Sequence, residues 1–178
     1  LQLQEDGLPV LEFGDITFGN ADIFLRSDFN VARVEAVRGG SASTFASNSP
    51  GGVINLISKT GETEGGSIQG TLGLDYEEYR VDADYGGRLG SDLRFHVGGF
   101  YRQGEGPRRA GYDGNKGGQI KANITKSFAD GGYVRLYGKY LDDRAIGYLP
   151  NPVRVTGSNS DPDYVNLPNF SINNDTLH

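Results

Sequence analysis

Five stretches in the second half of the chain alternate apolar and polar side chains, each over about ten residues. They are Ser67–Tyr76, Tyr79–Gly87, Leu93–Arg102, Gln119–Phe128 and Tyr133–Asp142. Because successive side chains of a β-strand point to opposite faces, each stretch predicts a strand with one apolar and one polar face. A soluble sheet buries its apolar face against another layer, whereas the sheet of a membrane barrel turns that face to lipid. The choice between these two environments decides what kind of protein this is.

The length of the predicted strands favours a membrane barrel. Ten residues rise ~33 Å, or ~23 Å at a tilt of about 45°, which is close to the ~25 Å apolar band of an outer-membrane barrel. Strands of globular proteins average about five or six residues. Aromatic side chains stand at the strand ends, where an interfacial girdle would place them: Tyr76, Tyr79, Tyr101, Phe128, Tyr133 and Tyr140. On pattern alone, a soluble β-sandwich or meander remains the alternative.

Composition excludes several other classes of protein. The sequence has no Cys, which excludes disulfides and thiolate metal sites. It also lacks the run of about 18 apolar residues that would predict a transmembrane helix. Its net charge is −6, and its basic residues are scattered along the predicted strands. We therefore expect no nucleic-acid partner, because proteins that bind nucleic acids present a basic face.

The first 65 residues differ from the rest of the chain. They hold shorter strand-like pieces, Val31–Arg38 and Gly52–Lys59, on either side of the small-residue stretch Gly39–Gly52. Glycine, serine and alanine in such density allow sharp turns and close approach of the backbone. We therefore predict two domains, residues 1–65 and residues 66–178, with a boundary near Gly65.

The connections between the predicted strands indicate an orientation. Those after the second and fourth strands are short, whereas Gln103–Gly118 after the third strand is long and the chain after Asp143 is longer still. Outer-membrane barrels keep short turns on the periplasmic side and long loops outside, so the first strand would start at the periplasmic side. Because five strands cannot close a barrel and single bacterial chains use at least eight, we expect this chain to be part of a larger protein.

The segment Val31–Gly61 resembles the plug domain of TonB-dependent outer-membrane receptors. Two motifs of that family appear in the correct order, at Val34–Gly39 and at Gly51–Lys59, and Glu5–Pro9 looks like an earlier "DG-aliphatic-P" strand of the plug. The resemblance implies an all-β membrane protein. The later part of a small mixed α+β plug would precede the first ~5 antiparallel strands of a barrel of about 22 strands. The sequence departs from the family pattern at Gly40, where proline is usual, and at Phe45–Ala46, where Tyr-Gly is common.

The resemblance also implies roles for individual residues. Glu35 and Arg38 would belong to a group of charges that pairs with the polar inner wall of the barrel and holds the plug. The full set expected for the plug signature and the plug–barrel contacts is Glu35, Arg38, Gly39, Gly51, Gly52 and Asn55. The candidate substrate-facing residues are Phe45, Arg108, Arg109, Tyr112, Arg144 and Tyr148. Packing inside the plug for Phe45, and plain solvation for the loop charges, are the alternatives.

The sequence gives no indication of an enzyme. His96 and His178 are far apart in the chain and the only histidines, so we expect no metal site, and we expect no cofactor and no catalytic residue. Asp82 and Asp84 alternate along one strand beside Arg80, which suits a polar wall better than acid–base catalysis by two carboxyls of separated pKa values.

The resemblance implies a function in transport at the bacterial cell outer membrane. The protein would import a scarce, large substrate by energy-coupled movement of the plug. The resemblance implies that this substrate would be a ferric siderophore or other metal chelate, or an oligosaccharide. The expected partners are the transported ligand, outer-membrane lipid and a TonB-type energy-transducing complex of the inner membrane, whose binding segment is not in this sequence. A soluble β-rich binding or adhesion module is the alternative.

Overall fold

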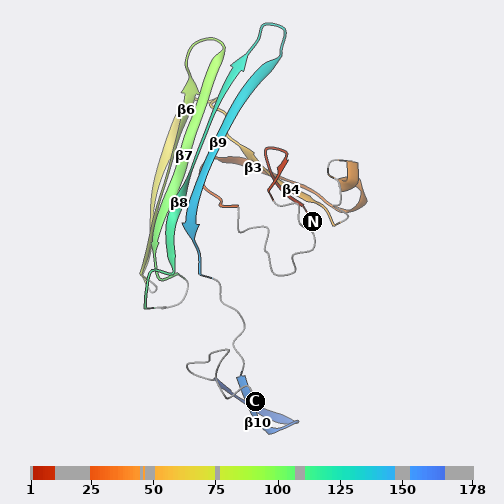
Figure 1. Ribbon diagram of the computed structural model, residues 1–178, viewed down its shortest axis with the longest axis vertical. Helices are drawn as coiled ribbons and strands as arrows, with labels where there is room; N and C mark the ends of the chain where they lie inside the picture. The colour runs from red at the N-terminus through yellow and green to blue at the C-terminus, as the bar shows by residue number, and fades with distance from the viewer. Residues whose placement is uncertain are drawn as a thin grey trace. The chain divides into compact units, whose positions relative to one another are not determined.

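The computed structural model describes residues 2–10, 25–44, 46, 51–74, 77–106, 111–146 and 153–166. The chain forms two compact units, Leu1–Ala145 and Ile146–His178. The described residues build three β-sheets, two of them in the first unit and one in the second (Figure 1). No helix in the described part of the chain is long and apolar enough to span a bilayer.

The larger sheet of the first unit has five antiparallel strands in the order β5-β6-β7-β8-β9. The strands are β5 (Gly65–Gly73), β6 (Glu78–Arg88), β7 (Leu93–Gly104), β8 (Asn115–Ser127) and β9 (Tyr133–Arg144). Each strand pairs with the next one along the chain, without a crossover. The five alternating stretches of the sequence are therefore confirmed as strands, and β7 and β8 extend further into the long connection than predicted. The bounds of the first stretch were predicted too late in the chain, since β5 begins at Gly65 and ends at Gly73.

Burial in this sheet is the reverse of what a soluble sheet shows. Along β8 the polar residues Gln119, Lys121 and Thr125 are buried, with exposed fractions of 5%, 2% and 0%. The alternating apolar residues Ile120 and Ile124 are 54% and 37% exposed. The other exposed apolar side chains on the same face of the sheet include Ile68, Leu72, Val81, Tyr85, Val134, Leu136 and Tyr140. The sheet thus has a buried polar face and an exposed apolar face, which we call the inner and the outer face.

The smaller sheet of the first unit lies on the inner-face side and has the order β2-β1-β4-β3 (Figure 1). Its strands are β1 (Gln2–Glu5), β2 (Leu8–Pro9), β3 (Val31–Val37) and β4 (Val53–Ser58), and the 3-10 helix η2 (Gly39–Thr44) follows β3. β1 pairs in parallel with β4, which pairs antiparallel with β3. The two strand-like pieces predicted in the first 65 residues are confirmed as β3 and β4.

The segment Glu5–Pro9 is a tight hairpin and not a single strand, so that expectation was wrong. Asp6 and Gly7 have positive φ angles of 50° and 83°, which turn the chain back so that β2 pairs with β1. Two successive residues with positive φ are typical of the two-residue hairpin turn that the sequence Asp-Gly favours. The side chain of Asn55 supports the turn, because its Oδ1 accepts a hydrogen bond of 3.0 Å from the Gly7 amide.

The second unit contains a hairpin that the sequence pattern did not predict. β10 (Val153–Ser158) pairs antiparallel with β11 (Asp161–Asn166) around a two-residue turn. This part of the chain was expected to be loop. Gly157, with φ of 86°, places a left-handed backbone next to the turn, a conformation that glycine adopts without strain.

Candidate functional site

The inner face of the five-stranded sheet is held by three segments of the first 65 residues. These anchoring segments are Glu5 at the end of β1, Arg26–Asn30 before β3, and Lys59–Gly61 after β4. Each contributes charged or hydrogen-bonding groups to polar side chains of the sheet, which would otherwise be buried without partners. The site is therefore an interface between two parts of the chain.

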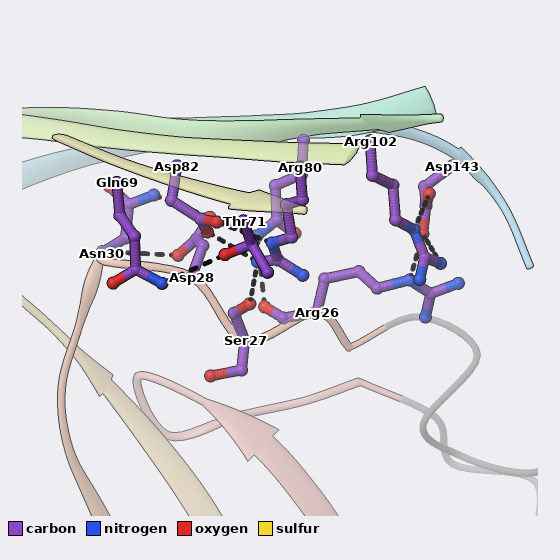
Figure 2. Close-up of polar contacts among 11 residues, drawn as sticks. Arg26, Ser27, Asp28, Asn30, Gln69, Thr71, Arg80, Asp82, Arg102 and Asp143 are labelled. Atoms are coloured by element: carbon purple, nitrogen blue, oxygen red, sulfur yellow. Dashed lines mark hydrogen bonds and ion pairs between the residues drawn. The ribbon is translucent and has the colours of Figure 1, made fainter. Parts of the chain in front are cut away.

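The first cluster is centred on Asp143 of β9. Its carboxylate side chain is fully buried and receives hydrogen bonds from two arginines, Arg102 of β7 and Arg26 of the anchoring segment. Arg102 donates from Nε to Oδ1 at 2.8 Å and from Nη2 to Oδ2 at 2.7 Å, and Arg26 donates from Nε to Oδ2 at 2.5 Å (Figure 2). Arg102 and Asp143 form a planar pair with two hydrogen bonds within the inner face of the five-stranded sheet. Arg26 bonds to the same carboxylate and so joins the anchoring segment to the sheet.

The rest of Arg26–Asn30 lies along the middle of the inner face. The Ser27 carbonyl accepts a hydrogen bond of 2.8 Å from Nη2 of Arg80 (Figure 2). Asp28 Oδ2 accepts one of 2.6 Å from Nε2 of Gln119. Arg80 is itself oriented by Asp82, to which it donates two bonds, at 2.7 and 2.6 Å. Arg80 is thus held both by a residue of its own strand and by the anchoring segment.

A glycine makes the close approach of this segment possible. Gly98 of β7 is an inner-face position, opposite Asp84 on one side and Lys121 on the other. A Cβ atom built there would lie 2.9 Å from Oδ1 of Asn30 and 2.8 Å from the Ala83 carbonyl oxygen. Asn30 is 1% exposed, so any larger residue at position 98 would displace a side chain that has nowhere to move.

The second cluster is centred on Glu5 of β1. Its Oε1 accepts a short hydrogen bond from Nζ of Lys121, and its Oε2 accepts one of 2.6 Å from Nζ of Lys139. The two lysines lie directly opposite each other on β8 and β9, an arrangement that is repulsive unless an anion lies between them. The Glu5 carboxylate, which belongs to the N-terminal sheet, is that anion and lies between the two lysines of the inner face.

The third cluster joins Lys59 to the strands β6 and β7. Nζ of Lys59 donates to Oδ2 of Asp84 at 2.8 Å, and Nε2 of His96 lies 3.0 Å from the same oxygen. The backbone also takes part, because the Lys59 carbonyl accepts a hydrogen bond of 2.8 Å from Nδ2 of Asn123. Close by, a Cβ atom at Gly61 would overlap the Phe95 carbonyl oxygen, so the chain reaches the wall here through backbone contact.

The plug-signature residues have mainly local roles. Glu35 pairs with Arg33 of its own strand at 2.8 Å, and both side chains are about half exposed. Gly39 and Gly52 have φ angles of 73° and 123° and act as backbone-geometry positions, and Gly51 lies in the turn before β4. Within the described residues, the contact of Glu35 is therefore not with the wall; a wall-pairing role for Arg38 stays a prediction.

The candidate substrate-facing residues are only partly within the described part of the chain. Phe45, Arg108, Arg109 and Tyr148 lie outside it. Tyr112 is 62% exposed in the loop between β7 and β8. Arg144 shares the outer face of β9 with Tyr140, because residues two and four apart on a strand point the same way. It therefore points away from the inner face, and its contact with a substrate stays a prediction.

The anchoring residues Glu5, Arg26 and Asp28 were not among the predicted site residues. They lie in a part of the chain without strong periodicity, and their partners follow about 90 or more residues later. Local pattern carries no signal of such contacts. Lys59 was part of the recognised motif, but its role as a wall contact was not predicted. Among the described residues, no group of three or more His, Cys, Asp or Glu side chains could hold a metal ion.

No protein-family model matches the chain, and no curated protein sequence matches it. Among solved structures, the chain is similar to the crystal structure of the ferripyoverdine receptor of the outer membrane of Pseudomonas aeruginosa bound to ferripyoverdine. The similarity has 19% sequence identity and a TM-score of 0.42, and it covers 85% of this chain. The chain spans 30% of the length of that receptor.

Proposed function

We propose that this chain is part of a TonB-dependent outer-membrane receptor, made up of a plug (residues 1–65) and the first strands of its barrel (66–178). The protein imports a scarce, large substrate across the outer membrane by energy-coupled movement of the plug. The substrate is a ferric siderophore or other metal chelate, or an oligosaccharide. The two motifs at Val34–Gly39 and Gly51–Lys59 support the assignment to this family. The exposed apolar face of the five-stranded sheet supports a location in the membrane.

The observation that carries the proposal is the reversed burial of the five-stranded sheet. Its inner face is charged and packed against the N-terminal segments, whereas its outer face exposes large apolar side chains such as Leu72 (73%) and Leu136 (68%). In water, an apolar face of this size is a liability, because soluble monomers rarely expose large contiguous apolar patches. In a bilayer the same face is buried in hydrocarbon, and only a closed sheet can lie there.

The aromatic residues agree with a membrane location. On the outer face, Tyr79 pairs with Tyr101 at one end of the sheet, with ring centroids 6.4 Å apart, and Tyr85 pairs with Phe95 toward the other end at 6.2 Å. Tyr79 and Tyr85 are six residues apart on β6, or about 20 Å along the strand. Two aromatic bands with this spacing, and apolar residues between them, are typical of a barrel that crosses the hydrocarbon layer.

The alternative, a soluble β-rich binding or adhesion module, has one requirement that separates it from a receptor. It would have to cover the outer face with a second protein layer, and within the described residues the N-terminal sheet lies on the inner face instead. Solubility decides between the two: a receptor needs detergent or lipid to stay monodisperse, whereas a soluble module does not.

Plug movement is tested by cross-linking in the intact protein that carries this chain, using the absence of Cys from the present sequence. A reducible thiol cross-linker between Glu5→Cys and Lys121→Cys ties the plug to the wall. A control link between Lys121→Cys and Lys139→Cys ties together two neighbouring wall strands. Uptake is measured as growth on ferric chelates or oligosaccharides as the sole source of iron or carbon.

The first link is expected to abolish energised uptake until it is reduced, whereas uptake through the control variant is expected to be the same with its link formed and with its link reduced. The single-cysteine variants show how much uptake is lost when the ion pairs of Glu5 are removed without a cross-link. Normal uptake through the protein with Glu5 linked to Lys121 would show that this part of the plug does not move, and it would refute the proposed mechanism.

A further inference from the structure

Two cations lie directly opposite each other on the outer face, at the end of the sheet that carries the long connections. They are Lys116 near the start of β8 and Arg144 at the end of β9, and they are partners in the strand register. Both point to the apolar side, in line with Ile120 on β8 and Tyr140 on β9. Like charges opposite each other on adjacent strands repel, so this arrangement is unfavourable unless an anion lies between them.

The surroundings of the two cations differ from those of the cations on the inner face. Lys121 and Lys139 form the same kind of opposed pair, and there the buried Glu5 carboxylate contacts both. Nζ of Lys116 lies 3.6 Å from Asp113, but the lysine side chain remains 49% exposed. Within the described part of the chain, Arg144 forms no ion pair and is exposed. Lys116 and Arg144 are therefore placed like Lys121 and Lys139, but no carboxylate of the described residues contacts both of them.

The carboxylates nearby do not fill that place. Asp113 is 42% exposed on its side chain and also accepts a hydrogen bond of 2.6 Å from Nε2 of Gln103. Asp142 shares the outer face of β9 with Arg144 and lies opposite Gly118, one outward position away from the cation pair. Both therefore flank the two cations, and they add polarity to the rim of the apolar face.

An apolar groove lies next to this polar rim. It has a volume of about 450 Å³ and is lined by outward side chains of Val81, Ala83, Tyr101 and Ile120 and by the backbone at Gly99. The small residues Ala83 and Gly99 lie opposite each other on β6 and β7 and form its floor. Ile120 is four residues from Lys116 on the same face of β8, about 13 Å along the strand.

The groove and the cations are connected by a hydrogen-bonded aromatic cluster. Tyr79 and Tyr101 both donate to Oε1 of Gln103, at 2.9 and 3.0 Å. Tyrosines with an apolar ring and a polar hydroxyl are typical of the boundary between hydrocarbon and headgroups. Toward the end of the sheet that carries the long connections, the outer face thus changes from an apolar groove to tyrosine hydroxyl groups and then to the two cations.

The geometry points to a specific lipid site on this face. A phosphorylated lipid of the membrane leaflet at this end places its phosphate between Lys116 and Arg144 and an acyl chain in the groove floored by Ala83 and Gly99. The phosphate supplies the anion that the register pair lacks, and the acyl chain covers the groove. This inference rests on the proposed function, because it requires that the outer face meets lipid.

The test uses the intact protein in phosphatidylcholine nanodiscs. Phosphatidic acid is titrated as the phosphorylated probe and diacylglycerol as the phosphate-free comparison, and retained lipids are counted by native mass spectrometry. Each of Lys116→Gln and Arg144→Gln is expected to weaken retention of phosphatidic acid about fivefold, and the double variant about 30-fold, from the ~1 kcal/mol that one cation near a lipid surface contributes. Diacylglycerol retention should not change.

Two further variants make the test specific. Ala83→Leu fills the groove and is expected to weaken retention of both lipids. Lys126→Gln removes another outward cation of β8, which pairs with Asp92 at the opposite end of the strand, and should leave retention of phosphatidic acid unchanged. Equal effects of Lys126→Gln and the double variant would show only general electrostatic attraction and would overturn the site.

Failure of this site can be distinguished from failure of the proposed function. A protein that inserts into nanodiscs but retains phosphatidic acid equally well with and without Lys116 and Arg144 has no such site, while its membrane location stands. A protein that stays monodisperse in water and does not insert refutes both.

Discussion

Replacing Asp143 by asparagine removes the negative charge between two arginines while nearly keeping the shape of the side chain. The carboxylate is fully buried, and Arg26 and Arg102 are only 16% and 15% exposed on their side chains. Breaking a buried ion pair by removing one partner costs about 3–5 kcal/mol, because the remaining charge stays buried without compensation. Both guanidinium groups keep some contact with water, so we expect the lower end of this range, about 3 kcal/mol.

Asp142→Asn is a matched control on the adjacent residue. Asp142 points to the outer face and is exposed, so its replacement should change the free energy of unfolding by no more than about 0.5 kcal/mol. The measurement is urea unfolding of the intact protein in lipid vesicles. The midpoints are compared between variants whose unfolding free energy has the same slope against urea concentration. The two neighbouring substitutions should therefore differ by about 3 kcal/mol, a factor of more than about 100 in the unfolding equilibrium.

A double-mutant cycle locates the effect. Arg26→Gln alone leaves Asp143 bonded to Arg102, so it should destabilise the protein less than Asp143→Asn, and the two losses should not add in the double variant. If Asp143→Asn matches the wild type, or if Asp142→Asn causes an equal loss, the carboxylate does not hold the two parts of the chain together and the interface has been misassigned.

Two matched pairs test the faces of the sheet by the same unfolding measurement. Leu72→Arg places a charge on the exposed apolar face and should cost ~2–4 kcal/mol in a bilayer, whereas Thr71→Arg on the polar face should cost much less; equal losses would mean that the sheet does not meet lipid. Gly98→Ala forces a Cβ against the Ala83 carbonyl and Asn30 and should cost about 1–3 kcal/mol, while Gly138→Ala on the outer face, with open space around it, should be close to neutral. Equal tolerance at positions 98 and 138 would show that the anchoring segment does not lie against the wall.

The strands were predictable from the sequence because alternation is a local property of the backbone. Once β6 to β9 are strands, the polarity of each face follows from the same alternation. Phe100 shows the limit of this reasoning, since it is an apolar residue on the inner face, 6% exposed, with the Arg80 guanidinium 4.0 Å from its ring centroid. Its position depends on a side chain of the preceding strand β6, which no pattern along β7 reveals.

The contacts between the two parts of the chain could not be predicted in the same way. Glu5 and Lys121 are 116 residues apart, and nothing in the sequence near either of them specifies the other. Within the two motifs that resemble a plug, Glu35 pairs with Arg33 of its own strand, whereas Lys59 contacts Asp84 of the inner face; Glu5 lies outside both motifs. A motif preserves a local backbone shape, whereas an ion pair across an interface depends on how two folded parts are placed against each other. The hairpin β10–β11 was missed for a related reason, since six-residue strands give too short an alternation to stand out.

The chemistry of the interface reconciles tight anchoring with the movement that the proposed function requires. Removing one member of a buried ion pair is costly because the other charge remains buried, but separating the two members so that both return to water is close to neutral. Glu5, Arg26 and Lys59 each contact the wall through charged groups rather than through a large apolar surface. Single substitutions therefore overstate how strongly the N-terminal segments are held against displacement as a unit. An apolar interface of equal area would resist separation in proportion to the surface exposed, about 25 cal/mol per Å². A polar interface with matched charges fixes the position of the proposed plug while leaving a lower free-energy cost for moving it, as the proposed transport mechanism requires.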